Sequence, residues 1–443
     1  MKKSYGIVVI GGGPAGLAAA IKAYDSGEKN VLIIERDDKL GGILNQCIHN
    51  GFGLTRFKES LTGPEYAYRF IIEAKKRDIE IMTGTTVLSL SANNENNADN
   101  KITAINPEDG VFTVSAKAVI LAMGCRERSR GALNIPGSRP AGIFSAGAAQ
   151  KFVNIKGYLP GKKVVILGSG DIGLIMARRM TLEGAKVQAV CEIMPYSSGL
   201  TRNIVQCLDD FGIPLYLSHT ITKIEGKDRV TGVEVSAVDK DKKPIPGTEI
   251  RFDCDTVLFS VGLIPENELS KEAGIELSPR TKGAVVDQTR ETSVSGIFAC
   301  GNVLQVHDLV DFVSEEAEIA GQAAAEYSKN GSSEKRFILT REGAEVSYVL
   351  PQKIDLNKAE DVAIYFRVRS TVAKAAVIMK SGEQVIAEFK KPIVVPGEMQ
   401  RVKLSASLFG DISGDITVEV KNNDERIDLH RMSEGLPNNR RTY

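Results

Sequence analysis

A short, unbroken apolar run followed by a glycine-rich turn occurs twice along the chain. The first run, at residues 7–10, leads into Gly-Gly-Gly-Pro-Ala-Gly at 11–16. The second run, at 164–167, leads into Gly-Ser-Gly-Asp-Ile-Gly at 168–173. Continuous apolar runs of this kind are typical of strands that are buried on both faces of a parallel sheet. The pattern therefore predicts two such strands, each ending in a glycine turn.

Each turn is followed by a predicted helix and then by a second strand that ends in an acid. The helices are predicted over 17–23 and 174–182, and the strands after them close on Glu35 and Glu192. The third glycine and the acid are equally far apart in the two copies, at 16 and 35 and at 173 and 192. This equal spacing indicates an internal repeat of a βαβ unit.

Beyond about residue 336 the pattern changes to short alternating segments separated by turn material. The predicted strands are 345–350, 362–368, 375–379, 385–389, 399–404 and 416–420. Regularly spaced strands without a helical stretch predict an antiparallel β-sandwich appended to the α/β part. The Asn-rich segment 92–100 is expected to be a surface turn between strands, and 436–443 a frayed tail.

Charge and composition exclude several classes of protein. Lys+Arg and Asp+Glu each number 56 in the 443 residues, which argues against a nucleic-acid partner. No apolar run is long enough to span a membrane, and the N-terminus carries no signal-peptide pattern. The six cysteines have no metal-site or CxxC spacing, so a reducing cytoplasm is the expected location.

The spacing of the glycines has a physical reason in dinucleotide binding. The first glycine makes the tight turn, the second lets the backbone approach a pyrophosphate, and the third lets helix and strand pack closely. The acid then accepts hydrogen bonds from ribose hydroxyls. Two such sites imply two cofactors that exchange electrons. Glu192 is followed by Ile193 and Met194 with no nearby arginine, which favours NADH over NADPH.

With these motifs the chain resembles the two-dinucleotide-binding-domain flavoproteins, relatives of glutathione reductase and the NADH oxidases, over about residues 5–330. The resemblance implies an α/β fold with two Rossmann-like domains, the NAD domain inserted in the FAD domain. The implied FAD domain is 1–152 plus 285–335, the NAD domain is 153–284, and the β-sandwich is 336–443.

The resemblance also implies which residues contact the two cofactors, FAD and NAD(H). The implied FAD contacts are Gly11, Gly13, Pro14, Ala15, Gly16, Glu35, Arg36, Gly42, Val87, Ala122, Gly124, Gly301 and Asn302. The implied NAD(H) contacts are Gly168, Gly170, Asp171, Ile172, Gly173, Glu192 and Gly262. Asn302 departs from the superfamily pattern, in which an acid follows this last glycine of the FAD site. An amide can still hydrogen-bond the ribityl chain of the flavin.

Three segments match one subgroup more narrowly: 41–53, 124–128 and 306–310. That subgroup is similar to the flavoprotein partner of glycerol-3-phosphate dehydrogenase. It implies an NADH-linked flavin subunit that works beside a second dehydrogenase subunit, in a homo- or hetero-oligomer. It leaves the electron acceptor open, whether a small molecule such as oxygen or the partner.

The candidate catalytic residues are Cys47, His49 and His307. Glutathione-reductase relatives place a CxxxxC pair at Cys47, but Phe52 stands at the second position, so no disulfide forms within this loop. Cys47 could cycle through a sulfenic acid beside the flavin, with His49 lowering its pKa, or could simply pack there. His307 precedes a helix expected to begin near Val313. Either histidine could relay protons or be structural.

Three functions follow from these alternatives. The first is an FAD-dependent NADH oxidoreductase that passes electrons to oxygen or to a partner subunit. The second is a self-sufficient single-cysteine peroxidase or oxidase that uses Cys47. The third is a non-catalytic scaffold, which is disfavoured because both Glu35 and Glu192 are present. For the first function, electrons are expected to leave the flavin on the face away from the NAD domain, where Cys47, His49 and His307 are expected to lie.

Overall fold

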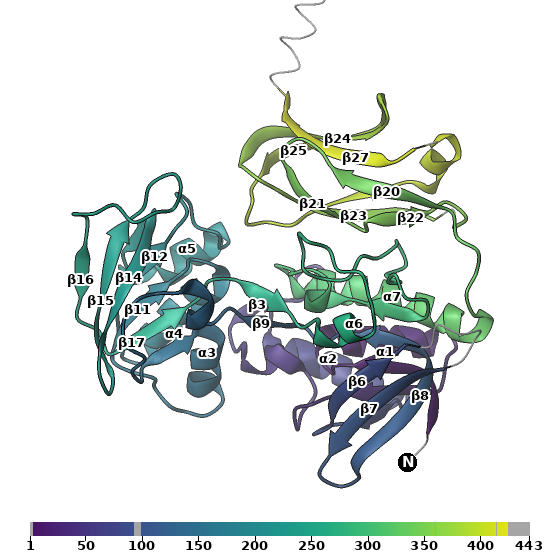
Figure 1. The fold of residues 1–443 in the computed structure, drawn as a ribbon, viewed down its shortest axis with the longest axis horizontal. Coiled ribbons are helices and arrows are strands. Elements are labelled where there is room, and N and C mark those ends of the chain that lie inside the picture. Colours follow the sequence, from purple (N-terminus) through teal and green to yellow (C-terminus); the bar gives the residue numbers. More distant parts are fainter. Residues whose placement is uncertain (1–2, 93–98, 359, 413, 424–443) are drawn as a thin grey trace, which may run out of the picture.

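The chain folds into three bodies, each built around its own sheet or pair of sheets (Figure 1). The structure is a computed structural model that describes residues 3–92, 99–358, 360–412 and 414–423. The Asn-rich residues 93–98 and the predicted tail 436–443 lie outside the described residues. The strands that flank the Asn-rich segment, β6 (Thr86–Ser91) and β7 (Asn100–Asn106), are antiparallel neighbours.

The first glycine unit forms the centre of a seven-stranded sheet. β1 (Ser4–Ile10) pairs in parallel with β2 (Val31–Ile34) on one side and with β8 (Gly110–Leu121) on the other. β5 (Glu80–Met82) extends the sheet beyond β2, and β7 and β6 extend it beyond β8. β1 and β2 are buried on both faces, which is why their sequences are continuously apolar rather than alternating.

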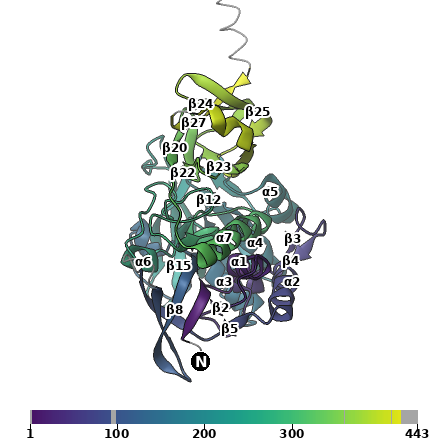
Figure 2. The ribbon, with the colours of Figure 1, turned by 90° about the vertical axis from the view of Figure 1, so that its right-hand side faces the viewer.

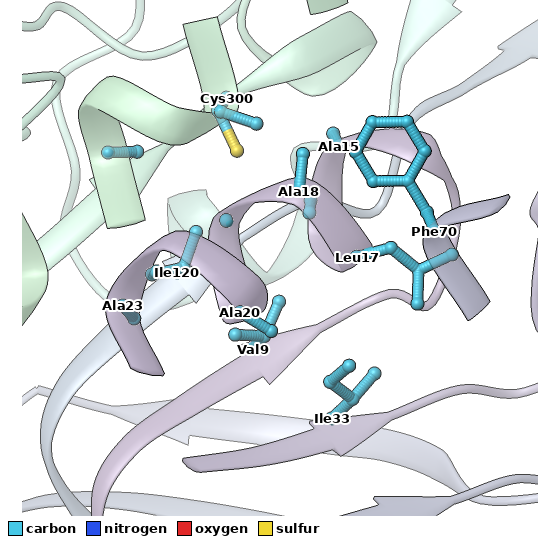
Figure 3. Close-up of a cluster of buried hydrophobic side chains, with 14 of the residues drawn as sticks. Val9, Ala15, Leu17, Ala18, Ala20, Ala23, Ile33, Phe70, Ile120 and Cys300 are labelled. Atoms are coloured by element: carbon cyan, nitrogen blue, oxygen red, sulfur yellow. The ribbon is translucent and has the colours of Figure 1, made fainter. Parts of the chain in front are cut away.

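Helices α1 (Pro14–Asp25) and α7 (Val310–Asn330) pack against one face of this sheet and against each other. Their close approach depends on small residues, because a Cβ at Gly321 would overlap the carbonyl oxygen of Ala19. Figure 3 shows the apolar cluster between α1 and the sheet, with Leu17 toward Phe70 of α2 (Gly63–Lys76). The expected helix start near Val313 is wrong by nearly one turn, since α7 begins at Val310.

The chain leaves this sheet and returns to it only after it has formed the second glycine unit. β19 (Ile297–Ala299) pairs in parallel with β8, so that Ile297 lies opposite Val119. The outgoing β9 (Cys125–Glu127) and the returning β18 (Leu263–Pro265) form a two-stranded antiparallel link. This topology is that of one Rossmann-like unit inserted into another, as the resemblance implied.

The second body repeats the arrangement of the first. Its parallel sheet has the order β10 (Ile143–Ser145), β17 (Thr256–Phe259), β11 (Lys163–Leu167), β12 (Lys186–Glu192), β13 (Leu215–Leu217). Its helices are α3 (Ala146–Asn154), α4 (Asp171–Leu182) and α5 (Thr201–Cys207), and a separate sheet holds β14 (His219–Gly226), β15 (Val230–Ala237) and β16 (Ile250–Phe252). Two elements lie close to the predicted domain boundaries. β10, which precedes residue 153, pairs with β17 of the parallel sheet, and α6 (Glu268–Glu272) contacts β6 of the first body. The domain boundaries named above stay predictions.

The third body consists of two packed sheets, as Figures 1 and 2 show. One has the order β22 (Lys353–Asp355), β20 (Phe337–Glu342), β27 (Ile416–Asn422), β24 (Val372–Ser381), β25 (Gln384–Val394). The other has the order β21 (Val346–Leu350), β23 (Val362–Val368), β26 (Gln400–Leu404). The expectation of a purely antiparallel arrangement is wrong at one place, because β20 and β27 are parallel. β20 and β22 were not predicted, and a 3-10 turn at Ala406–Asp411 interrupts the strands.

The third body and the first body share one hydrophobic core, so the third body is not joined to the first by a linker alone. Leu350, Tyr365 and Met399 belong to the same buried cluster as Val8 and Val119 of the first sheet. The Gln288 side chain also exchanges two hydrogen bonds with the Asp355 backbone, at 2.9 and 2.8 Å. The two bodies are therefore expected to unfold together.

We predict that Leu350→Ala destabilises the first and third bodies in one transition. Leu350 is fully buried in the shared cluster, and removing such a side chain costs about 2–5 kcal/mol. The control is Val385→Ala, because Val385 is 43% exposed on β25. Urea unfolding followed by circular dichroism measures both variants. Two separate transitions in Leu350→Ala, with only the later one shifted, would contradict a shared core.

Candidate functional site

The first glycine turn leaves one glycine open and uses the other two for packing. Gly11 has a φ of 108°, and a Cβ there would overlap the carbonyl oxygen of Ala122. A Cβ at Gly16 would overlap the carbonyl oxygen of Gly11, where α1 passes the end of β1. At Gly13, by contrast, the nearest atom is 3.9 Å away, the Cα of Gly42. Gly13 therefore has no packing reason to be a glycine, and its open side is free for a ligand.

The second turn has the same division of roles. A Cβ at Gly168 would overlap the carbonyl oxygen of Ser260, and one at Gly173 would overlap that of Gly168. At Gly170 the nearest atoms are 3.7 Å away, the hydroxyls of Ser198 and Ser260. The matching geometry of the two turns shows that the sequence repeat is a structural repeat.

The two acids close their turns through the backbone. Glu35 is buried, and its Oε2 accepts a hydrogen bond of 2.7 Å from the amide of Gly12. Glu192 is also buried, and its Oε2 accepts hydrogen bonds from the amide and hydroxyl of Ser169, at 2.9 and 2.7 Å. Each carboxylate has further lone pairs, which can accept from a hydroxyl of a bound ribose.

Both turns open into one cavity of about 1800 Å³, lined by all three bodies. Ligand pockets are usually about 300–1,000 Å³, so this cavity has room for more than one dinucleotide-sized cofactor. The predicted cofactor residues that line it are Gly11, Gly13, Pro14, Ala15, Glu35, Arg36, Gly42, Val87, Ala122, Gly124, Asn302, Gly170, Asp171, Ile172 and Gly262. The other predicted cofactor residues do not line the cavity themselves: Gly16, Gly168, Gly173, Glu192 and Gly301. The open side of Gly13 toward the cavity fits a pyrophosphate, because a side chain there would block its approach.

Asn302 uses its side chain within the protein. Its Oδ1 accepts a 3.1 Å hydrogen bond from the amide of His307, and its Nδ2 lies 3.5 Å from the sulfur of Cys125. The amide thus holds the turn 302–307 along the wall of the cavity. Cys125 is half-buried, and burial raises the pKa of its thiol.

His307 lines the cavity, but its imidazole is turned into the protein. The side chain has no exposed area, and its Nε2 lies 2.9 Å from Oε2 of Glu316 in α7. Glu316 also accepts from the amide of Gly301, at 3.0 Å, and lies 3.3 Å from the guanidinium of Arg290. Burial would raise the pKa of Glu316, but these cationic and amide partners hold it below its usual range. This geometry favours the structural role for His307 over proton transfer at the cavity.

Cys47 lies at the end of the 3-10 turn Gly42–Gln46 and faces α3. Its thiol is 3.4 Å from the carbonyl oxygen of Ile43 and 3.8 Å from Oε1 of Gln150. Burial raises the pKa of this thiol to about 12, so the nucleophilic thiolate is disfavoured at neutral pH. Burial is the cause of this shift, and no effect of His49 on the thiol accompanies it.

His49 lies beside the second body rather than away from it. Burial lowers the pKa of the His49 imidazole, and the positive charge of Arg202 in α5 lowers it further. A hydrogen bond to the backbone carbonyl of Asn50 acts in the opposite direction. A Cβ at the neighbouring Gly51 would lie 3.2 Å from the guanidinium of Arg202. His49 therefore lies next to α5 of the second body, and the expectation that Cys47, His49 and His307 share one face of the flavin stays a prediction.

Several residues that shape this site carried no signal in the sequence. Glu316 stands in an acidic stretch of α7 that is typical of a solvent-exposed face, yet it is fully buried. Gln150 holds Gln46 and approaches Cys47 from a segment more than 100 residues away. Arg367 and Asp308 form an ion pair between the third body and the cavity wall. Only tertiary contacts reveal these partners.

The comparisons with known proteins agree with this fold and site. Residues 5–326 match the pyridine nucleotide-disulphide oxidoreductase family, and the chain belongs to it. The chain is 24% identical over 340 residues to an opine oxidase subunit of Agrobacterium tumefaciens, a match that covers 72% of this chain and 64% of that protein. It is 26% identical over 339 residues to an NADH oxidase of Methanocaldococcus jannaschii, with 73% and 68% covered. This chain thus spans less than two thirds of the opine oxidase protein.

A solved structure supports the same class. The thioredoxin reductase of T. acidophilum superposes with a TM-score of 0.61 at 27% identity, covering 74% of this chain and all of that one. Members of the family bind FAD and NAD(P)H, so the cofactor prediction is confirmed. By class the chain is an FAD-dependent NAD(P)H oxidoreductase. Within the described residues, no helix is both long and apolar enough to cross a membrane.

We predict that Gly13→Val abolishes FAD binding while the protein stays folded. A Cβ at Gly13 would have no neighbour closer than 3.9 Å, so the fold has room for a valine side chain at this position. The same side chain would block the approach of the pyrophosphate. Gly16→Val is the contrasting variant, because its side chain collides with Gly11 and should destabilise the fold. The ratio of flavin absorbance to protein absorbance reports bound flavin, and thermal unfolding reports stability. Full flavin content in Gly13→Val would contradict the assignment.

Proposed function

We propose that this chain oxidises NADH with bound FAD and passes the electrons to oxygen or to a partner subunit such as a glycerol-3-phosphate dehydrogenase. The observation that carries the proposal is that two equivalent glycine turns open into one cavity. When bound, the flavin supplies the two-electron redox chemistry. The protein contributes the orientation of both dinucleotides and the exclusion of water.

Each turn takes one cofactor in this proposal. FAD would be held in the first body by Gly13, Gly42 and Glu35. Asn302 would keep the cavity wall at residues 302–307 in place, because its side chain accepts a hydrogen bond from the amide of His307. Gly170 would hold NADH in the second body, and Glu192 would support the turn behind it through its hydrogen bonds to Ser169. The amides at the start of α1 and α4 would bind the phosphates of the cofactors, because a helix N-terminus favours negative charge.

A dithiol mechanism has no support in this chain. The structure describes all six cysteines as free. The candidate thiol, Cys47, has a pKa of about 12, which makes the single-cysteine alternative unfavourable as well. The proposal therefore assigns none of these thiols a part in electron transfer, which the flavin would supply when bound. His49 keeps its predicted role as a proton donor or acceptor at the cavity, while His307 is assigned to structure.

A partner protein is supported by the relatives and by the third body. The opine oxidase relative is by name one subunit of an enzyme. The family match ends at residue 326, so the third body is an addition that a partner could contact. The six free thiols support a reducing compartment such as the cytoplasm.

We predict that the protein prefers NADH and that Glu192→Gln weakens this preference. The buried carboxylate bonds the second turn and would repel the 2′-phosphate of NADPH. A hydrogen bond to a charged group is worth about 1.5–3 kcal/mol, so the ratio of kcat/KM for NADH over NADPH should fall roughly tenfold or more. Steady-state kinetics with both nucleotides measure the ratio. A wild-type protein that prefers NADPH would refute the proposal.

We predict that Cys47→Ser retains NADH oxidation within about threefold of the wild type. A thiol with a pKa of about 12 stays protonated throughout the physiological pH range, so it offers no thiolate there. Iodoacetamide should accordingly label Cys47 in mildly alkaline buffer far more slowly than it labels free N-acetylcysteine. Oxygen consumption measures turnover, and mass spectrometry measures labelling. Loss of turnover in Cys47→Ser, together with fast labelling, would favour the single-cysteine alternative.

A further inference from the structure

Residues 197–203 of the second body, which comprise a loop and the first turn of α5 and are called the loop 197–203 below, lie directly against the second glycine turn. The hydroxyl of Ser197 donates a 3.0 Å hydrogen bond to the carbonyl oxygen of Ser169. Oδ1 of Asp171 accepts hydrogen bonds from the amide of Leu200 and the side chain of Asn203, at 2.8 and 2.7 Å. The loop therefore borders the open side of the turn, where the proposed NADH site lies.

The third body reaches this loop through one turn, residues 395–398. A Cβ at Gly397 would lie 2.7 Å from the carbonyl oxygen of Ser198, so the two backbones are in direct contact. Pro396 and Gly397 line the same cavity as Gly170 and Ser198. The turn 395–398 and the loop 197–203 come from different bodies and are distant in sequence, so no local pattern predicted this contact.

The same turn is anchored to the flavin side of the cavity by Arg367. The Arg367 guanidinium donates to the carbonyl oxygen of Gly397, at 2.7 Å, and to that of Val306, at 3.1 Å. It also pairs with the carboxylate of Asp308, whose other oxygen accepts a 2.7 Å hydrogen bond from the amide of Met399. Arg367 and Asp308 are mostly buried, so this connection is shielded from solvent. The turn 395–398 thus spans from the cavity wall near Val306 to the loop 197–203.

From these contacts we infer that the third body completes the nicotinamide-dinucleotide site, with Gly397 as a positioning residue that sets the loop 197–203 against the second glycine turn. This inference rests on the proposed function, because it requires NAD(H) at Gly170. Any side chain at position 397 must displace either the turn 395–398 or the loop 197–203. Because Arg367 and Asp308 hold the turn, the loop is the part that yields.

The test compares two glycine-to-alanine variants of the same body. Gly397→Ala introduces the clash with Ser198, whereas Gly414→Ala has no neighbour closer than 3.8 Å. Neither glycine has a positive φ, so alanine is compatible with the backbone at both positions. The dissociation constant of NAD⁺ is measured by calorimetry on the oxidised, FAD-loaded full chain, with flavin content and unfolding temperature recorded for each variant.

We expect Gly397→Ala to raise the dissociation constant of NAD⁺ at least threefold while flavin content and unfolding temperature stay at wild-type values. Gly414→Ala should change none of the three. Arg367→Lys is the second variant, because the single ammonium nitrogen of lysine cannot take the places of both Nη1, which bonds Gly397, and Nη2, which bonds Val306 and Asp308. It should also weaken NAD⁺ binding. If Gly397→Ala loses flavin or unfolds, Arg367→Lys decides the question.

The outcomes separate this inference from the proposed function. A wild-type protein that binds neither FAD nor NAD⁺ would overturn the proposed function and this inference with it. A wild-type protein that binds both, with wild-type NAD⁺ affinity in Gly397→Ala and in Arg367→Lys, would overturn only the inference.

Discussion

The architecture depends on one backbone contact that occurs twice, between the first and the third glycine of each turn. Gly11 and Gly16, and likewise Gly168 and Gly173, approach so closely that neither pair leaves space for a Cβ. The contact places the start of a helix against the end of a strand and directs the helix amides toward the cavity. The buried acids Glu35 and Glu192 then close the turns from behind. Two cofactor sites facing one cavity follow from this repeated contact.

A second constraint is the buried carboxylate of Glu316. An unpaired charge in this environment would be costly, and Glu316 is paired with His307, Arg290 and the amide of Gly301. These partners fix the segment after β19 on α7, which in turn forms the wall of the cavity. Tyr365 of the third body covers them, with its ring centroid 6.3 Å from that of His307 and 5.6 Å from the Arg290 guanidinium. The third body is therefore part of the support of the site.

The cysteine pattern of this chain differs from what the family description suggests. The pair of thiols that a disulphide oxidoreductase mechanism requires is missing at Cys47, where Phe52 takes the second position. Gln150 instead lies beside the Cys47 thiol and accepts a hydrogen bond from Gln46, and burial raises the pKa of this thiol to about 12. In the described residues, no second thiol stands beside Cys47 at the position where a paired cysteine would be expected. This arrangement is the reason that the proposed function assigns no cysteine a part in electron transfer.

The sequence by itself determined the two βαβ units, the cofactor turns and the β-rich C-terminal part. These features depend on local patterns, in which apolar runs, glycine spacing and an acid at a fixed distance all act within about 30 residues. Only the tertiary structure decided that His307 faces Glu316, that His49 lies near Arg202, that β20 pairs in parallel with β27, and that Gly397 touches Ser198. Such contacts join segments that are distant in sequence, or they decide whether a side chain faces the cavity or the protein interior. They are set by how whole elements pack, and no local pattern of polar and apolar residues encodes that choice.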